Sequence, residues 1–302
     1  MADADDGDFD VAVVVVTHAG IGSMLTRCVD SVVGAGGVDR LLVVDNSAHA
    51  SVDDETPPGV DRLIRSPNRG FGAAANLAFA DPSLASTRYL ALLNDDVVVE
   101  PGWLVPLRHT LDGDDMIGAV QPKLLLAGVD PPTVNSLGVE LDRFAAGHDI
   151  AFGRADTDAN RPAGGCVSTI DIFTGGAVLF RRRFIDDFGG FDERYFLYYE
   201  DVDLALRGAR RGWTYRCDQR SVVHHEFGST TARDGDRTIL LRERNRLWAA
   251  FRFQSPATVA RAVWLSVRRV RHAPRAVHAR ALSAGIAGAP RMLRERAGQA
   301  RR

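Results

Sequence analysis

The amino-acid sequence predicts an α/β fold: a doubly wound, mainly parallel sheet in a single large domain, followed by a helical extension at the C-terminus. Apolar runs without helical periodicity alternate with amphipathic segments over roughly the first ninety residues, and parallel strands need such crossover helices. With 302 residues, of which 45% are hydrophobic and 25% charged, the chain can bury a core without disulfides. Its three cysteines therefore need not be paired.

Each expected element has its own local signal. Residues 9–16 form a β-branched apolar run, which is typical of a buried parallel strand. Apolar residues then recur at helical spacing over 25–32, which predicts a helix that Ser23 caps and that ends near Gly34. Further strands are expected at 40–44, 62–64, 89–93, 117–126, 213–217 and 221–224, further helices at 73–80, 101–111, 181–188 and 200–211, and loops with short strands over 127–169.

Polar residues follow several of the expected strands at the point where each strand ends. Ligands of parallel α/β sheets bind at the carboxyl ends of the strands, so we expect these side chains to converge on one crevice. The glycines near residue 70 are not spaced as in a Gly-x-Gly-x-x-Gly loop, and no Walker sequence occurs. The residues concerned are Thr17, His18, Asp45, Asn46, Asn68, Arg69, Asn94, Asp95 and Asp96.

The triplet Asn94-Asp95-Asp96 directly follows an apolar strand. A buried carboxylate is costly without a cation, and Mg²⁺ or Mn²⁺ prefers oxygen ligands, so the triplet is a candidate metal site. A solvated turn is an equally good interpretation of the triplet alone, because Asn and Asp are common in turns. Asp45 and Arg69 are likewise either solvated residues or contacts to a nucleotide base and an anion.

Glu200 and Asp201 begin an expected helix after the aromatic run 196–199. Acids in a first turn commonly do no more than complement the helix dipole. The aromatic run could also desolvate the two carboxylates and raise a pKa, which would suit a general base. His224 and His225 end a strand. An isolated histidine is usually structural, but one that converges on the acidic triplet would complete a Mn²⁺ site.

Seven motifs resemble those of family 2 glycosyltransferases with the GT-A fold, and are most similar to the bacterial rhamnosyltransferase-like branch that builds cell-surface polysaccharide. Each motif is weak alone, but all seven occur in the family's order over about residues 10–250. They are VVVVTH (13–18), VVDNS (43–47), NRGFGAAAN (68–76), LLNDDV (92–97), FTGGAVLF (173–180), GFDERYFLYYEDVDLALR (190–207) and VHH (223–225).

The resemblance implies a nucleotide-diphosphate-sugar donor, carrying UDP or dTDP, and a divalent metal, Mg²⁺ or Mn²⁺. Asp45 would contact the nucleotide. Asp96 would bind the metal that bridges the diphosphate, in the place of the family's D-x-D motif, from which Asn94 departs. His224 would be the histidine on the metal, with His225 less suited to that role. The other donor contacts that the resemblance implies are Thr17, Asn68, Arg69, Asn94, Asp95, Gly175 and Gly176.

On the acceptor side, the resemblance implies that Asp201 is the catalytic base. It would take a proton from the acceptor hydroxyl while that oxygen attacks the anomeric carbon from the opposite face, so that the configuration inverts. The transferred sugar is expected to be rhamnose or a related hexose, and the acceptor a lipid-linked molecule or a glycan. Asp192, Glu200 and His225 are expected to contact the acceptor or to support the other site residues.

Residues 256–302 are expected to form a basic amphipathic tail, after a flexible acidic stretch at 1–8 and a GT-A domain at 9–255. The tail carries eleven arginines and one glutamate, a net charge of +10, which leaves −12 for residues 1–255. Its valines and arginines fall on opposite helical sides, interrupted by Pro274. This pattern fits either peripheral contact with an anionic membrane or packing on the domain, and no element that reads nucleic acid accompanies it.

Two other functions share these features. A nucleotidyltransferase acting on a sugar phosphate would use the same sheet and acidic metal site but would not need a base after the aromatic run. A membrane-associated scaffold that binds nucleotide sugars without activity would keep the basic tail. The chain has no run of about 18 apolar residues and no basic leader, so we expect a cytoplasmic protein at the inner face of the membrane.

Overall fold

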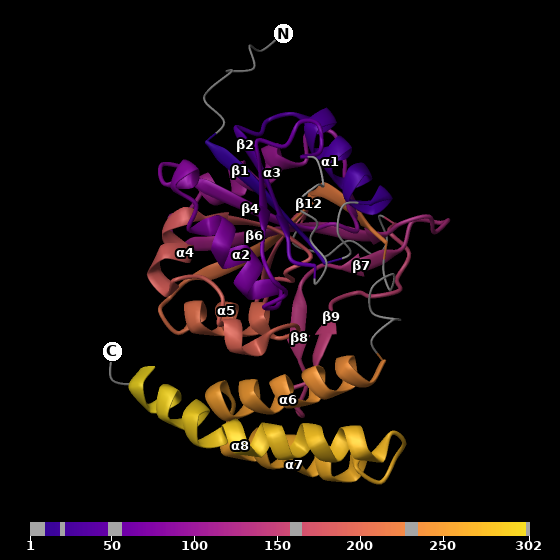
Figure 1. The fold of residues 1–302 in the computed structure, drawn as a ribbon, viewed down its shortest axis with the longest axis vertical. Coiled ribbons are helices and arrows are strands. Elements are labelled where there is room, and N and C mark those ends of the chain that lie inside the picture. Colours follow the sequence, from indigo (N-terminus) through magenta and orange to yellow (C-terminus); the bar gives the residue numbers. More distant parts are fainter. Residues whose placement is uncertain (1–9, 19–21, 48–55, 158–164, 227–234, 300–302) are drawn as a thin grey trace.

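The computed structural model describes residues 10–18, 22–47, 56–157, 165–226 and 235–299. The expected acidic stretch at residues 1–8 lies outside this part of the chain. The described residues form a sheet with helices on both faces and a layer of helices at the C-terminus (Figure 1). The predicted α/β class and doubly wound arrangement are therefore confirmed.

The central sheet has the strand order β10-β12-β6-β11-β4-β1-β2-β3, with β5 added to β12 and β7 to β6. Strands β3, β2, β1 and β4 run parallel, whereas β11 is antiparallel to both of its neighbours, β4 and β6. A separate hairpin joins β8 and β9. The strands are β1 Val11–Thr17, β2 Arg40–Asp45, β3 Arg62–Arg65, β4 Tyr89–Asn94, β5 Val97–Val99, β6 Ile117–Leu126, β7 Val134–Ser136, β8 Val139–Leu141, β9 Gly147–Asp149, β10 Val167–Ile170, β11 Ala177–Arg181 and β12 Thr214–His225.

β1 lies inside the sheet and is buried along its whole length, because helices cover both faces. Its even-numbered residues pack into one core with α2, α4 and α5, and its odd-numbered residues pack into a second core with α1 and α3. An unbroken β-branched run suits this two-sided apolar environment. These helices are α1 Ser23–Ala35, α2 Phe71–Phe79, α3 Leu104–Asp112, α4 Arg182–Phe188 and α5 Glu200–Ala209, with short 3-10 helices η1 Pro82–Leu84 and η3 Glu193–Tyr195.

Some element boundaries differ from the sequence prediction. The two strands expected at 213–217 and 221–224 are a single strand, β12, from Thr214 to His225, whose pairing is irregular after Asp218. Asp218 is fully buried there and accepts hydrogen bonds from Thr110 Oγ1 and Arg220 Nε, so the polar interruption is satisfied without ending the strand. The expected capping of α1 by Ser23 is wrong, because Ser23 is the first helical residue and no side chain caps this helix.

Three C-terminal helices form a layer below α5 and the β8–β9 hairpin (Figure 1). The sequence does not predict the first of them, because polar residues such as Asn245 and Arg246 occupy buried positions on it and obscure the apolar period. It packs along the last helix, where a Cβ atom added at Gly288 would lie 2.2 Å from Trp248 Nε1. The helices are α6 Gly235–Phe253, α7 Pro256–Arg269 and α8 Arg275–Gln299.

The tail packs in part on the rest of the protein and leaves some of its apolar side chains exposed. Val259 and Val263 pack against the apolar cluster between α6, α7 and α8. Trp264 and Val267 are about half exposed, at 52% and 45%, and the guanidinium of Arg268 lies over the Trp264 ring. Pro274 separates α7 from α8, as expected. Among the described helices, none combines the length and the apolar content that crossing a bilayer requires.

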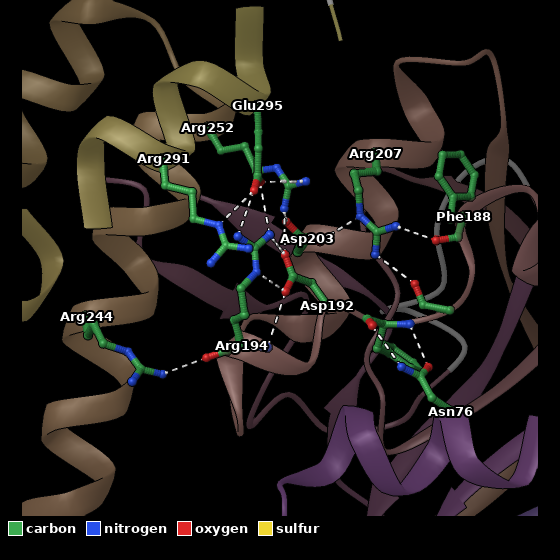
Figure 2. Close-up of polar contacts among 12 residues, drawn as sticks. Asn76, Phe188, Asp192, Arg194, Asp203, Arg207, Arg244, Arg252, Arg291 and Glu295 are labelled. Atoms are coloured by element: carbon green, nitrogen blue, oxygen red, sulfur yellow. Dashed lines mark hydrogen bonds and ion pairs between the residues drawn. The ribbon is translucent and has the colours of Figure 1, made fainter. Parts of the chain in front are cut away.

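Buried ion pairs join the C-terminal layer to η3 and α5 (Figure 2). Arg252, on α6, lies 3.0 Å from Asp192 and 2.6 Å from Asp203, measured between nitrogen and oxygen. Glu295, on α8, pairs with both Arg252 and Arg194. Because Asp203 is fully buried, its charge depends on these guanidinium partners.

Replacing Arg252 is expected to be strongly destabilising. Arg252→Ala would leave Asp192 and Asp203 each with one guanidinium fewer in a buried place, and we expect the free energy of unfolding to fall by about 3 kcal/mol in urea denaturation. Arg88→Ala is the control, because the Arg88–Asp112 pair is exposed and such pairs contribute up to about 1 kcal/mol. An equal loss in the two variants would contradict this account of the network.

Candidate active site

Two adjoining cavities lie at the carboxyl ends of β1, β2 and β4. The first has a volume of about 250 Å³, and its lining includes His18, Asn46, Asn68, Asp95 and Asp96. The second has a volume of about 570 Å³, and its lining includes Asp149, Gly175, Gly176, Glu200 and Asp201. Both are lined by Phe71, Asn94, Leu197, Tyr198, His225 and Arg242. Residues far apart in the sequence therefore meet around one continuous space.

The end of β2 and the segment before α2 hold each other in place beside the first cavity. Asn46 Nδ2 donates to the carbonyl of Gly70 at 3.2 Å, and Asn68 Oδ1 accepts from the Gly70 amide at 3.1 Å. Asp45 is fully buried; its Oδ1 accepts from the Ser47 amide at 2.9 Å, and its Oδ2 has no hydrogen-bond partner among the described residues. Asp45 itself lines neither cavity.

Thr17, at the end of β1, supports Asp95 through a hydrogen bond. Thr17 Oγ1 donates to Asp95 Oδ2 at 2.5 Å, and Thr17 is fully buried, so it supports the acidic triplet and does not itself line either cavity. Burial raises the pKa of Asp95 to about 6, the nearby charge of Asp96 acts in the same direction, and the Thr17 hydrogen bond opposes both.

Asp96 and His225 face each other across the junction of the cavities. His225 Nε2 lies 3.2 Å from Asp96 Oδ1, and His225 Nδ1 lies 2.7 Å from Asn135 Oδ1. The Asn135 oxygen can only accept, so Nδ1 carries a hydrogen and Nε2 can turn its lone pair toward the carboxylate. A carboxylate oxygen and an imidazole nitrogen at this spacing suit a divalent cation. The described residues contain no cluster of three or more such ligands, so this pair would leave room for phosphate oxygens and water.

The structure corrects the choice between the two histidines. His224, expected beside Asp96, instead places its Nε2 2.8 Å from Glu100 Oε1, on the other side of β12. Neighbouring residues of a strand point to opposite faces, so only one of the two can reach the cavities. The irregular pairing within β12 sets which one does, and sequence alone gives no register for it.

Asp201 lies at the start of α5, in the wall of the second cavity. Its Oδ2 accepts from the Gly175 amide at 3.0 Å, and its Oδ1 accepts from the Val202 amide at 2.7 Å. Burial raises the pKa of Asp201, while these two amide hydrogen bonds oppose the rise. A Cβ atom added at Gly175 would lie 3.2 Å from Phe71 Cε1, so glycine allows this close approach. The carboxylate is thus fixed and has a raised proton affinity, as a general base needs.

Glu200 is buried beside Asp201 with a different role. Its Oε2 has no hydrogen-bond partner among the described residues. Burial raises the pKa of Glu200 to about 8, and the charge of Asp201 adds to the rise. Because Asp201 has two amide donors and Glu200 Oε2 has none, a proton shared by the pair favours Glu200, which leaves Asp201 as the carboxylate.

Two arginines of α6 line the cavities although the sequence does not predict this helix. The guanidinium of Arg237 lies over the Phe196 ring at 4.6 Å from its centroid, and that of Arg242 lies over Tyr198 at 4.4 Å. Arg237 lines the first cavity and Arg242 lines both. Stacking orients a guanidinium while leaving its N–H groups for an anion.

Five predicted site residues line neither cavity: Thr17, Asp45, Arg69, Asp192 and His224. Arg69 makes an exposed ion pair with Glu193 at 3.0 Å. Asp192, expected near the acceptor, belongs to the buried network with Arg194 and Arg252. Asp192 and Asp201 belong to one sequence motif, and only the fold shows that their side chains lie in different surroundings.

If Asp96 and His225 hold a metal ion, replacing His225 should weaken metal binding, because its Nε2 lies 3.2 Å from Asp96 Oδ1. In titration calorimetry with Mn²⁺ and UDP, His225→Ala should bind about tenfold or more weakly than the original protein. His224→Ala is the matched control and should bind within about twofold of it. The reverse order would assign the metal to His224 and overturn the correction above.

Replacing Glu200 should change how stability depends on pH. The pKa of Glu200 lies near 8 in the folded protein, above the ordinary 4.5. The folded state therefore keeps this proton to a higher pH than the unfolded state, and stability is lost as pH rises from 4.5 to about 8. Glu200→Gln removes this loss, so urea denaturation should show the variant to be more stable than the original near pH 9, by about 2 kcal/mol or more, and equal to it near pH 4. Equal stability near pH 9 would refute the buried proton.

Several bacterial proteins are similar to parts of this chain. O-antigen biosynthesis protein RfbC of Myxococcus xanthus is 33% identical over 153 residues, which is 49% of this chain and 12% of that protein. N-acetylglucosaminyl-diphospho-decaprenol L-rhamnosyltransferase of Mycobacterium tuberculosis is 45% identical over 58 residues, 19% of each chain. Pre-mycofactocin glycosyltransferase of the same species is 28% identical over 224 residues, 72% of this chain and 43% of that protein. This chain thus matches less than half the length of each.

Solved structures share the fold at low sequence identity. GalNAc-T7 with UDP, GalNAc and Mn²⁺ aligns with a TM-score of 0.65 and 14% identity, over 89% of this chain and 52% of that chain. Mannosyltransferase PcManGT from Pyrobaculum calidifontis, with GDP-Man and Mn²⁺, aligns with a TM-score of 0.53 and 14% identity, over 93% of this chain and 87% of that one.

A protein-family model matches most of the chain. The model described as Glycosyltransferase like family 2 matches residues 10–249, which include every element from β1 to β12. The motif order that suggested this family is therefore confirmed, and the chain belongs to the family 2 glycosyltransferases and has the GT-A fold.

Proposed function

We propose that this protein is an inverting, metal-dependent glycosyltransferase of cell-surface polysaccharide synthesis. It would move a sugar, with rhamnose favoured, from a nucleotide-diphosphate sugar to a lipid-linked or glycan acceptor. The observation that carries the proposal is the pair of adjoining cavities, one with Asp96 and His225 and the other with Asp201. A donor sugar at their junction would have its diphosphate on one side and a base on the other.

The first cavity fits the nucleotide-diphosphate part of a donor. Asp45 keeps an unsatisfied oxygen for a donor group of the base or ribose. Arg237 and Arg242 are held by aromatic rings beside the acidic triplet and would contact phosphate oxygens. Asp96 and His225 would hold Mg²⁺ or Mn²⁺, and a divalent cation there would neutralise charge on the departing diphosphate. The two fold relatives carry UDP and GDP-Man; for this chain we propose UDP or dTDP.

Asp201 would activate the acceptor. The carboxylate takes the proton of an acceptor hydroxyl while that oxygen forms a bond to the anomeric carbon of the donor sugar. The bond from that carbon to the diphosphate oxygen breaks, and the nucleoside diphosphate leaves with its electron pair. Attack and departure occur on opposite faces of the sugar, so the configuration inverts. A nucleotidyltransferase has no use for this buried base, which is why we favour sugar transfer.

The walls of the second cavity favour an acceptor that carries phosphate. Arg242 and Arg269 line this cavity together with Asp201. A relative of this chain is named for a diphospho-decaprenol acceptor. We extend the proposal to peripheral contact with the inner face of the cell membrane through α7, where Trp264 is exposed next to Arg268. We propose no nucleic-acid partner.

Replacing the base should separate chemistry from donor binding. The original protein is incubated with UDP-, dTDP- and GDP-sugars, Mn²⁺ or Mg²⁺, and a lipid-diphosphate-linked sugar acceptor, and product is followed by chromatography. With the best donor, Asp201→Asn should lower kcat about 10²- to 10⁴-fold and leave nucleotide binding by calorimetry unchanged.

The control variant is Asp186→Asn, which alters an exposed carboxylate paired with Arg182 and should retain full activity. Undiminished turnover of Asp201→Asn would remove the base from the mechanism. Release of pyrophosphate instead of nucleoside diphosphate would indicate a nucleotidyltransferase. Nucleotide binding without any turnover would indicate a scaffold.

A further inference from the structure

The turn that precedes Asp201 has an unusual backbone. Phe196, Tyr198 and Tyr199 have φ values of 68°, 67° and 70°. Residues other than glycine rarely adopt this left-handed region, and each one that does is strained. Three of them within four positions will persist only where the surrounding structure holds them. The contacts that hold this turn therefore also determine where the next residues, Glu200 and Asp201, lie.

Asn245, on α6, makes those contacts with a single amide group. The side chain is fully buried, and its Nδ2 donates to the carbonyls of Tyr195, Leu197 and Tyr198 at 2.9, 2.9 and 2.7 Å. The amide is itself oriented by Arg244, whose Nε donates to Asn245 Oδ1 at 2.8 Å. The amide nitrogen carries two hydrogens, so it shares one of them between two of these three carbonyls, and Arg244 Nη2 also donates to the Tyr195 carbonyl at 2.8 Å.

The opposite side of the turn rests on the segment before α2. The Phe71 amide donates to the Phe196 carbonyl at 2.8 Å. Gly70 permits this approach, since a Cβ atom there would lie only 2.1 Å from the same carbonyl oxygen. The turn is therefore fixed between two elements, and α6 is one of them.

The ion pairs in Figure 2 fix the chain on both sides of the turn to the same C-terminal layer. Asp192 precedes the turn and Asp203 follows it, and Arg252 of α6 contacts both. Asn245 lies on α6 two helical turns before Arg252. It holds the turn residues that lie between Asp192 and Asp203 in the chain. The layer thus holds the base-bearing segment at three places.

We propose that Asn245 is a positioning residue for the catalytic base. It acts through the turn 195–199, whose geometry sets the direction from which the Asp201 carboxylate enters the second cavity. This inference rests on the proposed function, because it takes Asp201 to be the base. It also implies that the C-terminal helices are part of the catalytic unit and do more than attach it to a surface.

The test compares Asn245→Ala and Asn245→Ser in the full chain. Without the amide, the carbonyls of Leu197 and Tyr198 lose this donor, while that of Tyr195 keeps Arg244 Nη2 at 2.8 Å. The turn relaxes, and the base moves from its productive place. We expect kcat to fall about 10- to 100-fold, while the KM for the donor and calorimetric binding of Mn²⁺ with UDP change by less than about threefold. The acidic limb of the kcat–pH profile should move to lower pH, because a less confined Asp201 has a pKa nearer its ordinary value. The serine variant, which keeps one donor, should fall in between.

The matched control is Asn76→Ala. Asn76 also fixes a backbone segment through its side-chain amide, because it donates to the Phe191 carbonyl at 2.9 Å and accepts from the Phe191 amide at 2.8 Å. Phe191, however, precedes the turn 195–199. The control variant should lose stability in urea while keeping kcat and the pH profile. If the Asn245 variants fold and bind UDP but keep the original kcat and the original kcat–pH profile, the inference is wrong. If the original protein transfers no sugar, or Asp201→Asn is fully active, the proposed function fails instead.

Discussion

The pairing of β4 with β11 is the constraint on which the site depends. β11 runs antiparallel to β4, so the start of β11 meets the end of β4, and the Asn94 amide donates to the Gly176 carbonyl at 3.0 Å. The acidic triplet and the glycine pair are thereby neighbours. Gly175 then donates to Asp201, which brings in the start of α5. Two backbone amides thus connect the acidic triplet to Asp201, which lies far later in the chain.

Buried charges separate the structural part of the molecule from the part that can react. Asp203 is fully buried and forms ion pairs with the guanidinium groups of Arg207 and Arg252, so its role is structural. Glu200 and Asp45 each keep a buried oxygen without a partner among the described residues. An unsatisfied buried carboxylate costs free energy that folding alone does not justify, so such groups mark places where a ligand or a proton is expected. Both lie at the edge of the sheet where the strands end.

The C-terminal layer has more to do with the site than its sequence indicates. Its basic charge and its valine pattern suggest a surface helix, and part of α7 is one. α6, however, supplies Asn245 to the turn before the base, and Arg242 to the wall of both cavities. These are polar side chains on a helix that the apolar period does not reveal. Their partners lie roughly fifty residues earlier, a separation at which no local pattern indicates contact.

The sequence by itself determined the alternation of strands and helices, the polar strand ends, and the candidacy of Asp96 and Asp201, because each depends on local periodicity or on motif order. The tertiary structure decided which of two adjacent histidines faces Asp96, since strand register depends on partner strands. It also shows that Asp192 lines neither cavity and that residues of α6 line both of them. Side-chain direction and long-range packing are set by the free energy of the whole fold, and a single segment does not carry that information.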